Sequence, residues 1–159
     1  MSLETAVIGI IQLVIAIILA VVALYIGFSV LGKITKGIDE EKEIAKGNAA
    51  VGILVASVFI AIAIVVQSGI AGVSSGISKA LAGDVFALVA SLFQLILGIV
   101  LAIAAIYLAL NILDKLTKGI DEFGELKKGN VAVALEMAGV IIAVAIIIQS
   151  GVLGITAGL

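Results

Sequence analysis

The stretch TAVIGIIQLVIAIILAVVALYIGFSVLG, residues 5–32, is 28 residues long and carries no charged side chain. A helix rises about 1.5 Å per residue, so this stretch can cross the roughly 30 Å hydrocarbon core of a bilayer. Two further runs, 49–78 and 85–113, are also free of charge, and a fourth, 131–159, is interrupted only by Glu136. Four membrane-spanning helices are therefore predicted.

The composition supports the same class of protein. The chain is 64% hydrophobic and 13% charged, with a mean hydropathy of +1.43, far from the balance of a soluble domain. The runs lack the alternating pattern of a membrane barrel, and helices pair all of their own backbone groups in lipid. Because no basic region precedes the first run, we expect it to remain in the mature protein rather than act as a signal peptide.

The chain is an internal duplication. Shifted by 82 positions, residues 2–77 align with 84–159, and 33 of the 76 aligned pairs are identical. Each copy has two apolar runs around a charged loop, which predicts an all-α integral membrane protein built from two parallel helical hairpins. The predicted units are a first repeat at 1–78 with helices 5–32 and 49–76, an exterior linker at 79–84, and a second repeat at 85–159 with helices 85–113 and 131–157.

The lysines predict the orientation in the membrane. Eight of the nine lie in the two charged loops, and only Lys79 lies between the copies. Positive residues are enriched on the cytoplasmic side of membrane proteins. We therefore expect a multi-pass protein of the cell membrane, with both loops in the cytoplasm and both termini outside.

The two charged loops are the best-matched part of the duplication, and they allow two interpretations. In the structural one, Asp39 and Asp121 begin short helical turns, and the glycines and asparagines that follow end each turn and cap the next helix. The cap residues are Gly47, Asn48, Gly129 and Asn130. In the functional one, the loops are paired docking sites for a cytoplasmic partner. The candidate docking residues are Lys33, Thr35, Lys36, Asp39, Glu40, Lys115, Thr117, Lys118, Asp121 and Glu122. Capping alone does not explain why Thr35-Lys36 recurs as Thr117-Lys118.

At this loop the chain resembles a known family, the YjfL-like membrane proteins grouped as a domain of unknown function numbered 350. The shared pattern is an acidic loop, a Gly-Asn pair before the second helix and small residues after it. It occurs here as Asp39-Glu40, Gly47-Asn48 and Ala50, and again as Asp121-Glu122, Gly129-Asn130 and Ala132. The resemblance implies a cytoplasmic membrane protein with tandem hairpins, sometimes associated with envelope stress, and it supplies no catalytic residue.

Polar residues inside the apolar runs are costly unless they find partners. Four glutamines correspond across the copies at similar depth and could form a hydrogen-bonded layer: Gln12, Gln94, Gln67 and Gln149. Contacts between helices, each worth about 0.6 kcal/mol, are one interpretation, and a ring lining a narrow constriction is the other.

Small residues recur at four-residue spacing near the end of each copy, so that each set shares one helix face. They are Ser68, Gly72 and Gly76 in the first copy and Ser150, Gly154 and Gly158 in the second. Small faces let membrane helices approach closely, so we expect packing between the copies or between subunits. The alternative is that these glycines only loosen the helix ends.

Glu136 breaks the symmetry of the duplication, because the first copy has Leu54 at this position. A carboxylate inside a membrane helix needs a partner, a proton or water. Antiparallel pairing predicts Tyr107 and Asn111 as its neighbours. It is either a proton- or cation-handling site or an acid that is neutral or reaches the cytoplasmic interface.

Several function classes find no support in the sequence. Without His or Cys there is no imidazole base, thiolate nucleophile or zinc-finger set, and a net charge of -2 with mixed loop signs argues against nucleic acid. We predict no enzyme activity, metal or cofactor. The expected partners are the lipid bilayer, further copies of the chain and a cytoplasmic protein. The resulting hypothesis is an oligomeric structural or adaptor protein, and the alternative is a small ion channel using Glu136 and the glutamines.

Overall fold

The computed structural model describes residues 3–35, 37–117 and 119–157. Within these residues the chain forms six helices: α1 (Leu3–Ile34), α2 (Glu40–Ala45), α3 (Ala49–Leu81), α4 (Val85–Leu116), α5 (Glu122–Lys127) and α6 (Val131–Ala157). Four of them are long and apolar enough to cross a membrane, over Ala6–Ser29, Ala49–Leu81, Val85–Lys115 and Val131–Gly154. The predicted fold class, an all-α membrane protein with four spanning helices, is confirmed.

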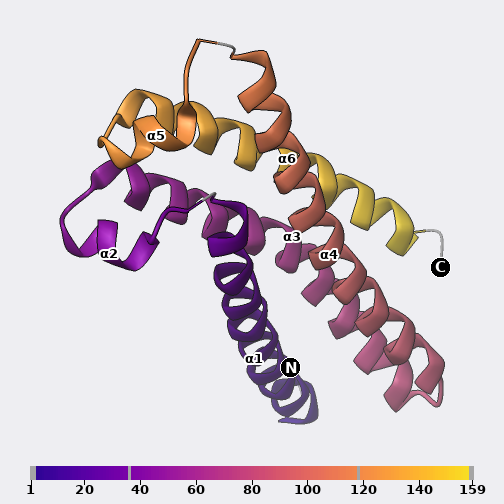
Figure 1. Ribbon diagram of the computed structural model, residues 1–159. Coiled ribbons are helices and arrows are strands. Elements are labelled where there is room, and N and C mark those ends of the chain that lie inside the picture. Colours follow the sequence, from indigo (N-terminus) through magenta and orange to yellow (C-terminus); the bar gives the residue numbers. More distant parts are fainter. Residues whose placement is uncertain (1–2, 36, 118, 158–159) are drawn as a thin grey trace.

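The two hairpins run parallel. Figure 1 shows the short helices α2 and α5 at the same end of the molecule, where α3 and α6 begin, and the turn between α3 and α4 at the opposite end. This arrangement follows from the even number of long helices in each repeat. We call the end with α2 and α5 the loop end, and the end with the turn between α3 and α4 the turn end.

The long helices extend further than the apolar runs predicted. α3 continues to Leu81 and therefore includes Lys79, which was expected in the linker. The helix stops because Gly83 takes a positive φ of 105°, and its N–H bonds to Ala80 O at 3.0 Å, as glycine commonly does at a helix end. Long charged side chains near a helix end can reach the interface without breaking the helix, so apolar runs underestimate its length.

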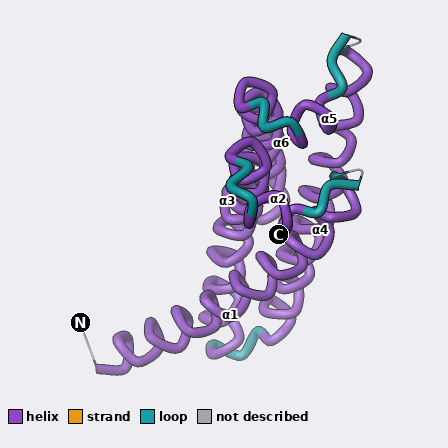
Figure 2. Tube along the Cα trace, turned by 60° about the vertical axis from the view of Figure 1, so that its left-hand side comes forward, coloured by secondary structure: helices purple, strands orange, loops and turns teal. Residues whose placement is uncertain are grey.

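α3 lies at the centre of the bundle and packs against α1, α4 and α6. Its side chains form much of the core, including the fully buried Ala50, Val51 and Leu54, and Ile141 of α6 belongs to the same core. In the most apolar part of α3, 56% of the residues are buried within the chain, against 6% in α1. α1 is thus the peripheral helix, and in Figures 1 and 2 its N-terminal half extends away from the others.

α1 is held to α3 at separate points along its length. Near the loop end, the rings of Phe28 and Phe59 lie 5.8 Å apart between centroids. Toward the turn end, Gln12 Nε2 donates to Ser74 O at 3.2 Å and to Ser78 Oγ at 3.3 Å. Gln12 therefore acts as a contact between helices of one hairpin, which is the packing interpretation of the glutamines.

Candidate functional site

The first charged loop is a small capped unit. The Asp39 carboxylate accepts from Lys42 N at 3.1 Å and caps α2. Gly47 follows with a φ of +83°, a conformation that favours glycine. Asn48 Oδ1 then accepts from Ala50 N at 3.1 Å and Val51 N at 3.2 Å, so its side chain begins α3.

The second loop repeats this construction position by position. Asp121 accepts from Gly124 N at 3.0 Å, Gly129 has a φ of +83°, and Asn130 accepts from Ala132 N at 3.1 Å. The cap residues named from the sequence thus occupy cap positions in both copies. Since each backbone turn is fixed by a side-chain hydrogen bond and a glycine, the two loops form defined turns rather than irregular segments.

A threonine and a glutamate are bonded inside each loop. Thr35 Oγ1 donates to the Glu40 carboxylate and also lies 2.9 Å from Leu31 O. Thr117 Oγ1 makes the same pair of contacts, to Glu122 and to Leu113 O at 2.7 Å. These Thr–Glu pairs join the end of each long helix to the short helix that follows, which explains why the threonine recurs.

The Thr–Glu pairs correct the predicted docking surface. Thr35 is 0% exposed, Glu40 is 9% and Glu122 is 1%, while Thr117 is half-buried. A partner cannot reach the buried Thr35, Glu40 and Glu122. The bonds of these residues and of Thr117 hold each loop together. The sequence pattern that could have indicated these hydrogen bonds is a Thr followed five positions later by a Glu in both copies.

Glu122 lies in an unfavourable setting for a charge. Its Oε2 is buried and has no hydrogen-bond partner within the described residues. Burial raises the pKa of Glu122, and the nearby carboxylates of Asp114 and Glu136 raise it further, against a bond to its own backbone that lowers it. The fold therefore makes this carboxyl harder to ionise than it is in the unfolded chain.

Two exposed ion pairs occupy the same place in the two loops. Lys46 Nζ lies 2.7 Å from Glu43 Oε1, and Lys128 Nζ lies 2.7 Å from Glu125 Oε1. The asparagine caps also donate to these glutamates. The hydrogen bonds from Lys46 and Asn48 lower the pKa of Glu43, and those from Asn130 and Lys128 lower the pKa of Glu125. The same contact raises the pKa of Lys128.

The two loops are also bonded to each other. Asn48 Nδ2 donates to Leu126 O at 2.9 Å and lies 3.4 Å from Lys127 O. The side chain that caps α3 in the first repeat therefore also holds the last turn of α5 in the second. The sequence indicates only the capping role of Asn48, because a contact across 78 residues has no local pattern.

The exposed charged side chains of the joined loops form what we call the loop surface. It contains three predicted docking residues, Asp39, Lys115 and Asp121, and it adds others that the prediction omitted. Its members are Asp39, Glu41, Lys42, Lys46, Lys115, Asp121, Lys127 and Lys128. Two predicted docking residues, Lys36 and Lys118, lie outside the described residues, as does the side chain of Lys33. Among the described residues, no three His, Cys, Asp or Glu gather as metal ligands.

The remaining polar residues of the membrane helices are placed less alike than the sequence predicted. Gln94 is 8% exposed, Gln149 is half-buried and Gln67 is exposed. Glu136 is exposed on α6. Asn111, one of its predicted neighbours, donates to the backbone of the other, Tyr107 O, at 2.7 Å within α4.

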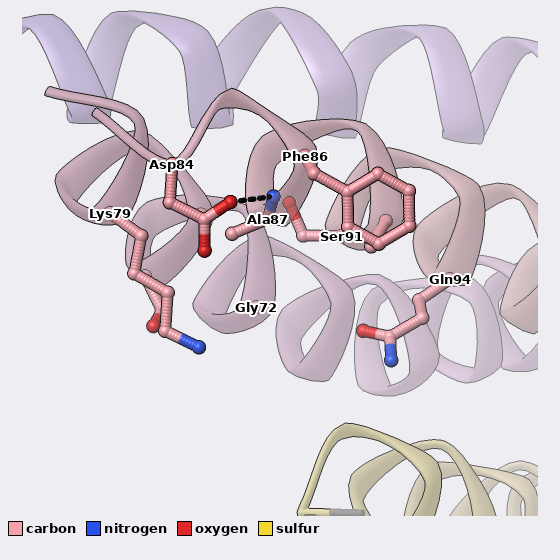
Figure 3. A pocket seen from close by; sticks show the side chains of 10 residues that line it. Gly72, Lys79, Asp84, Phe86, Ala87, Ser91 and Gln94 are labelled. Carbon is pink, nitrogen blue, oxygen red and sulfur yellow. Dashed lines mark hydrogen bonds between the residues drawn. The ribbon is translucent and has the colours of Figure 1, made fainter. Parts of the chain in front are cut away.

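The small-residue faces differ between the repeats. Ser68, Gly72 and Gly76 are buried, whereas Ser150 and Gly154 are exposed and Gly158 lies outside the described residues. Beside the buried face, near the turn end, is a cavity of about 180 Å³ lined by Gly72, Lys79, Phe86, Ser91 and Gln94 among others. In Figure 3 the Asp84 carboxylate caps α4 beside it by accepting from Ala87 N, at 3.2 Å.

Comparison with known proteins yields one family. The family described as Domain of Unknown Function (DUF350) matches residues 4–102 and again residues 87–157. No curated protein and no solved structure matches the chain. The first match covers the first hairpin and continues into α4, and the second covers most of the second hairpin. Two matches along one chain agree with the internal duplication.

Proposed function

Because the chain belongs to the DUF350 family, whose description names no activity, we propose its function from the loop surface. The protein is a non-enzymatic membrane adaptor that presents its two charged loops as one docking surface to a protein partner. The observation that carries this proposal is the hydrogen bond from Asn48 to Leu126 O. It joins the loops, so a partner meets one pre-formed surface rather than two independent segments.

Pre-formed surfaces bind at lower entropic cost than flexible ones. Each loop is fixed by an aspartate cap, a left-handed glycine, an asparagine cap and an internal Thr–Glu pair. Such rigid construction, made twice, is more than a simple turn between helices needs. Its result is a constant arrangement of exposed acidic and basic groups, which suits recognition of a partner with complementary charges.

The proposal places the loop surface in the cytoplasm and the protein in the cell membrane. Eight of the nine lysines lie in the two loops, and the positive-inside rule favours that orientation. The termini and the turn between α3 and α4 are then outside. The link to envelope stress is supported only by the sequence resemblance and concerns when the partner is recruited.

Site-specific photocrosslinking in intact cells tests the proposal. A photoreactive amino acid is placed at Glu41 and, separately, at Lys127, both exposed on the loop surface, and at Ala82, exposed at the turn end. The account predicts the same discrete product from both loop positions and none from Ala82. The product from Glu41 should be lost when Lys127→Glu and Lys128→Glu reverse charges on the other loop. Products that differ between the loops, or none from inserted protein, contradict the proposal.

An ion pathway is the second candidate. What favours it is the effect of Asp114 and Glu136 at the loop end, whose carboxylates both raise the pKa of buried Glu122. Flux into proteoliposomes is measured for wild type, Glu136→Gln and the double variant Gln67→Leu, Gln149→Leu. Flux above empty liposomes that falls in the variants supports a channel. Absence of flux from folded, inserted protein rejects it.

A further inference from the structure

The contact between α3 and α4 shows how one repeat meets the next. A Cβ added at Gly69 of α3 would lie 3.2 Å from Leu95 Cβ and 3.3 Å from Leu95 Cα of α4. A Cβ added at Gly76 would lie 3.0 Å from both Ala87 O and Leu88 Cα. Only glycine permits this backbone approach, which is the usual basis of close helix association in lipid.

The corresponding face of the second repeat is uncovered. The 82-residue shift places Gly151 at the position of Gly69 and Gly154 at that of Gly72. An added Cβ would meet nothing within 4 Å at either Gly151 or Gly154. Gly69, which closes a contact in the first repeat, thus has a counterpart in Gly151 without the helix that it would accommodate. Gly158, the counterpart of Gly76, lies outside the described residues.

The repeat itself identifies the missing helix. In the first repeat the face is covered by α4, the first helix of the following repeat, and α4 corresponds to α1. The positions of α1 that match the contact residues of α4 are open: Leu13, which matches Leu95, is 60% exposed, and an added Cβ at Gly9, which matches Ser91, would meet nothing within 4 Å. In Figures 1 and 2 the N-terminal half of α1 lies well apart from the C-terminal half of α6.

We propose that the turn-end half of α6 packs against the turn-end half of α1 from a second copy of the chain, repeating the α3–α4 contact between molecules. The two copies share one orientation in the bilayer, because α6 and α1 run in opposite directions through it, as α3 and α4 do. The contact joins two different faces, so each copy offers one of each and the assembly continues head to tail.

Disulfide crosslinking tests this contact directly, because the chain has no native cysteine. Cβ atoms about 3.5–4.5 Å apart allow a disulfide. The benchmark is the double variant Gly69→Cys, Leu95→Cys, which should form a bond within one chain. The test is co-expression of two differently tagged chains, one with Leu13→Cys and the other with Gly151→Cys. A disulfide dimer carrying both tags is expected, and neither variant should form it alone.

A matched control fixes the register of the contact. Gly139 is also an α6 glycine with no atom within 4 Å of an added Cβ, but it lies twelve residues, about 18 Å, nearer the loop end. Gly139→Cys should not crosslink to Leu13→Cys. Adding Gly154→Leu to the Gly151→Cys chain should lower the yield of the mixed dimer at least several-fold.

Three results would overturn the proposal. The first is a working benchmark with no mixed dimer. The second is equal crosslinking from Gly139→Cys, which indicates random collision. The third appears when Leu13→Cys and Gly151→Cys are placed in one chain: a bond formed within that chain and not between chains shows that its own α1 covers the face.

Discussion

Asn48 Nδ2 of the first loop lies 2.9 Å from Leu126 O at the end of α5 in the second. The same side chain accepts hydrogen bonds from Ala50 N and Val51 N. One asparagine therefore caps a membrane helix and joins the two repeats at the loop end. This double role is the basis of the first prediction.

Asn48→Asp should destabilise the protein more than Asn130→Asp. An aspartate keeps the capping oxygen in both cases and loses the amide donor to the neighbouring glutamate in both. Only at position 48 does it also lose the bond to Leu126 O, leaving a carboxylate against a carbonyl. We expect an extra loss of about 1–3 kcal/mol in the free energy of unfolding, measured by denaturation in detergent. Equal losses would show that the bond between the loops does not contribute.

Thr35→Val should weaken the first loop by removing the hydroxyl that donates to buried Glu40. The expected cost is about 1–3 kcal/mol, because a buried carboxylate is left without this donor. Thr35→Ser keeps the hydroxyl and is the matched control. Thermal unfolding in detergent compares the two, and a serine variant as unstable as the valine one would assign the effect to packing instead.

Glu122→Gln should remove part of the pH dependence of stability. Burial raises the pKa of Glu122 above its ordinary value of 4.5, so the contribution of this group is fully present below that value and is lost as the pH rises through the raised pKa. The glutamine variant is uncharged throughout, and its unfolding temperature should exceed that of wild type at neutral pH.

Glu125→Gln should have the opposite effect on stability in the same experiment. Its pKa is lowered by the bonds from Asn130 and Lys128, so its contribution is present above the ordinary carboxyl value and is lost on acidification. This variant should be less stable than wild type at neutral pH and match it in acid. Parallel pH profiles for the two variants would contradict a raised pKa for Glu122.

Gly69→Leu and Gly151→Leu should separate the two small-residue faces. At Gly69 a larger side chain would collide with Leu95 in the α3–α4 contact, and overpacking typically costs about 1–3 kcal/mol. At Gly151 an added Cβ meets nothing within 4 Å, so dilute, monomeric protein in detergent should unfold as wild type does. Denaturation curves compare the free energies of unfolding of the two variants. Equal values would contradict the difference between the two faces.

The sequence predicted the parts of this structure that local chemistry determines. Charge-free runs longer than a bilayer is thick specified the four spans, and Asp39, Gly47 and Asn48 act through backbone groups within a few residues of themselves. Helix ends were less accurate: Lys79 lies inside α3, because a charged residue at the interface does not end a helix whose backbone bonds continue.

What the sequence did not predict depends on tertiary contacts. The Thr35–Glu40 pair requires the chain to turn between two helices, and the bond from Asn48 to Leu126 O joins segments far apart in the sequence. Likewise, identical glycine spacing in the two copies gave no indication that Gly69 is covered and Gly151 is open. The difference lies in what packs on each face: α4 covers Gly69, and no described atom lies within 4 Å of a Cβ added at Gly151.

The side of the membrane that the joined loops face is the most direct test of the adaptor account. Single cysteines are introduced at Lys42, Lys127 and Ala82, which are all exposed, and intact cells are treated with a thiol reagent that does not cross membranes. The account predicts labelling of Ala82→Cys alone, with Lys42→Cys and Lys127→Cys labelled only after the membrane is opened. Labelling of the two loop cysteines in intact cells would place the loop surface outside and contradict docking of a cytoplasmic partner.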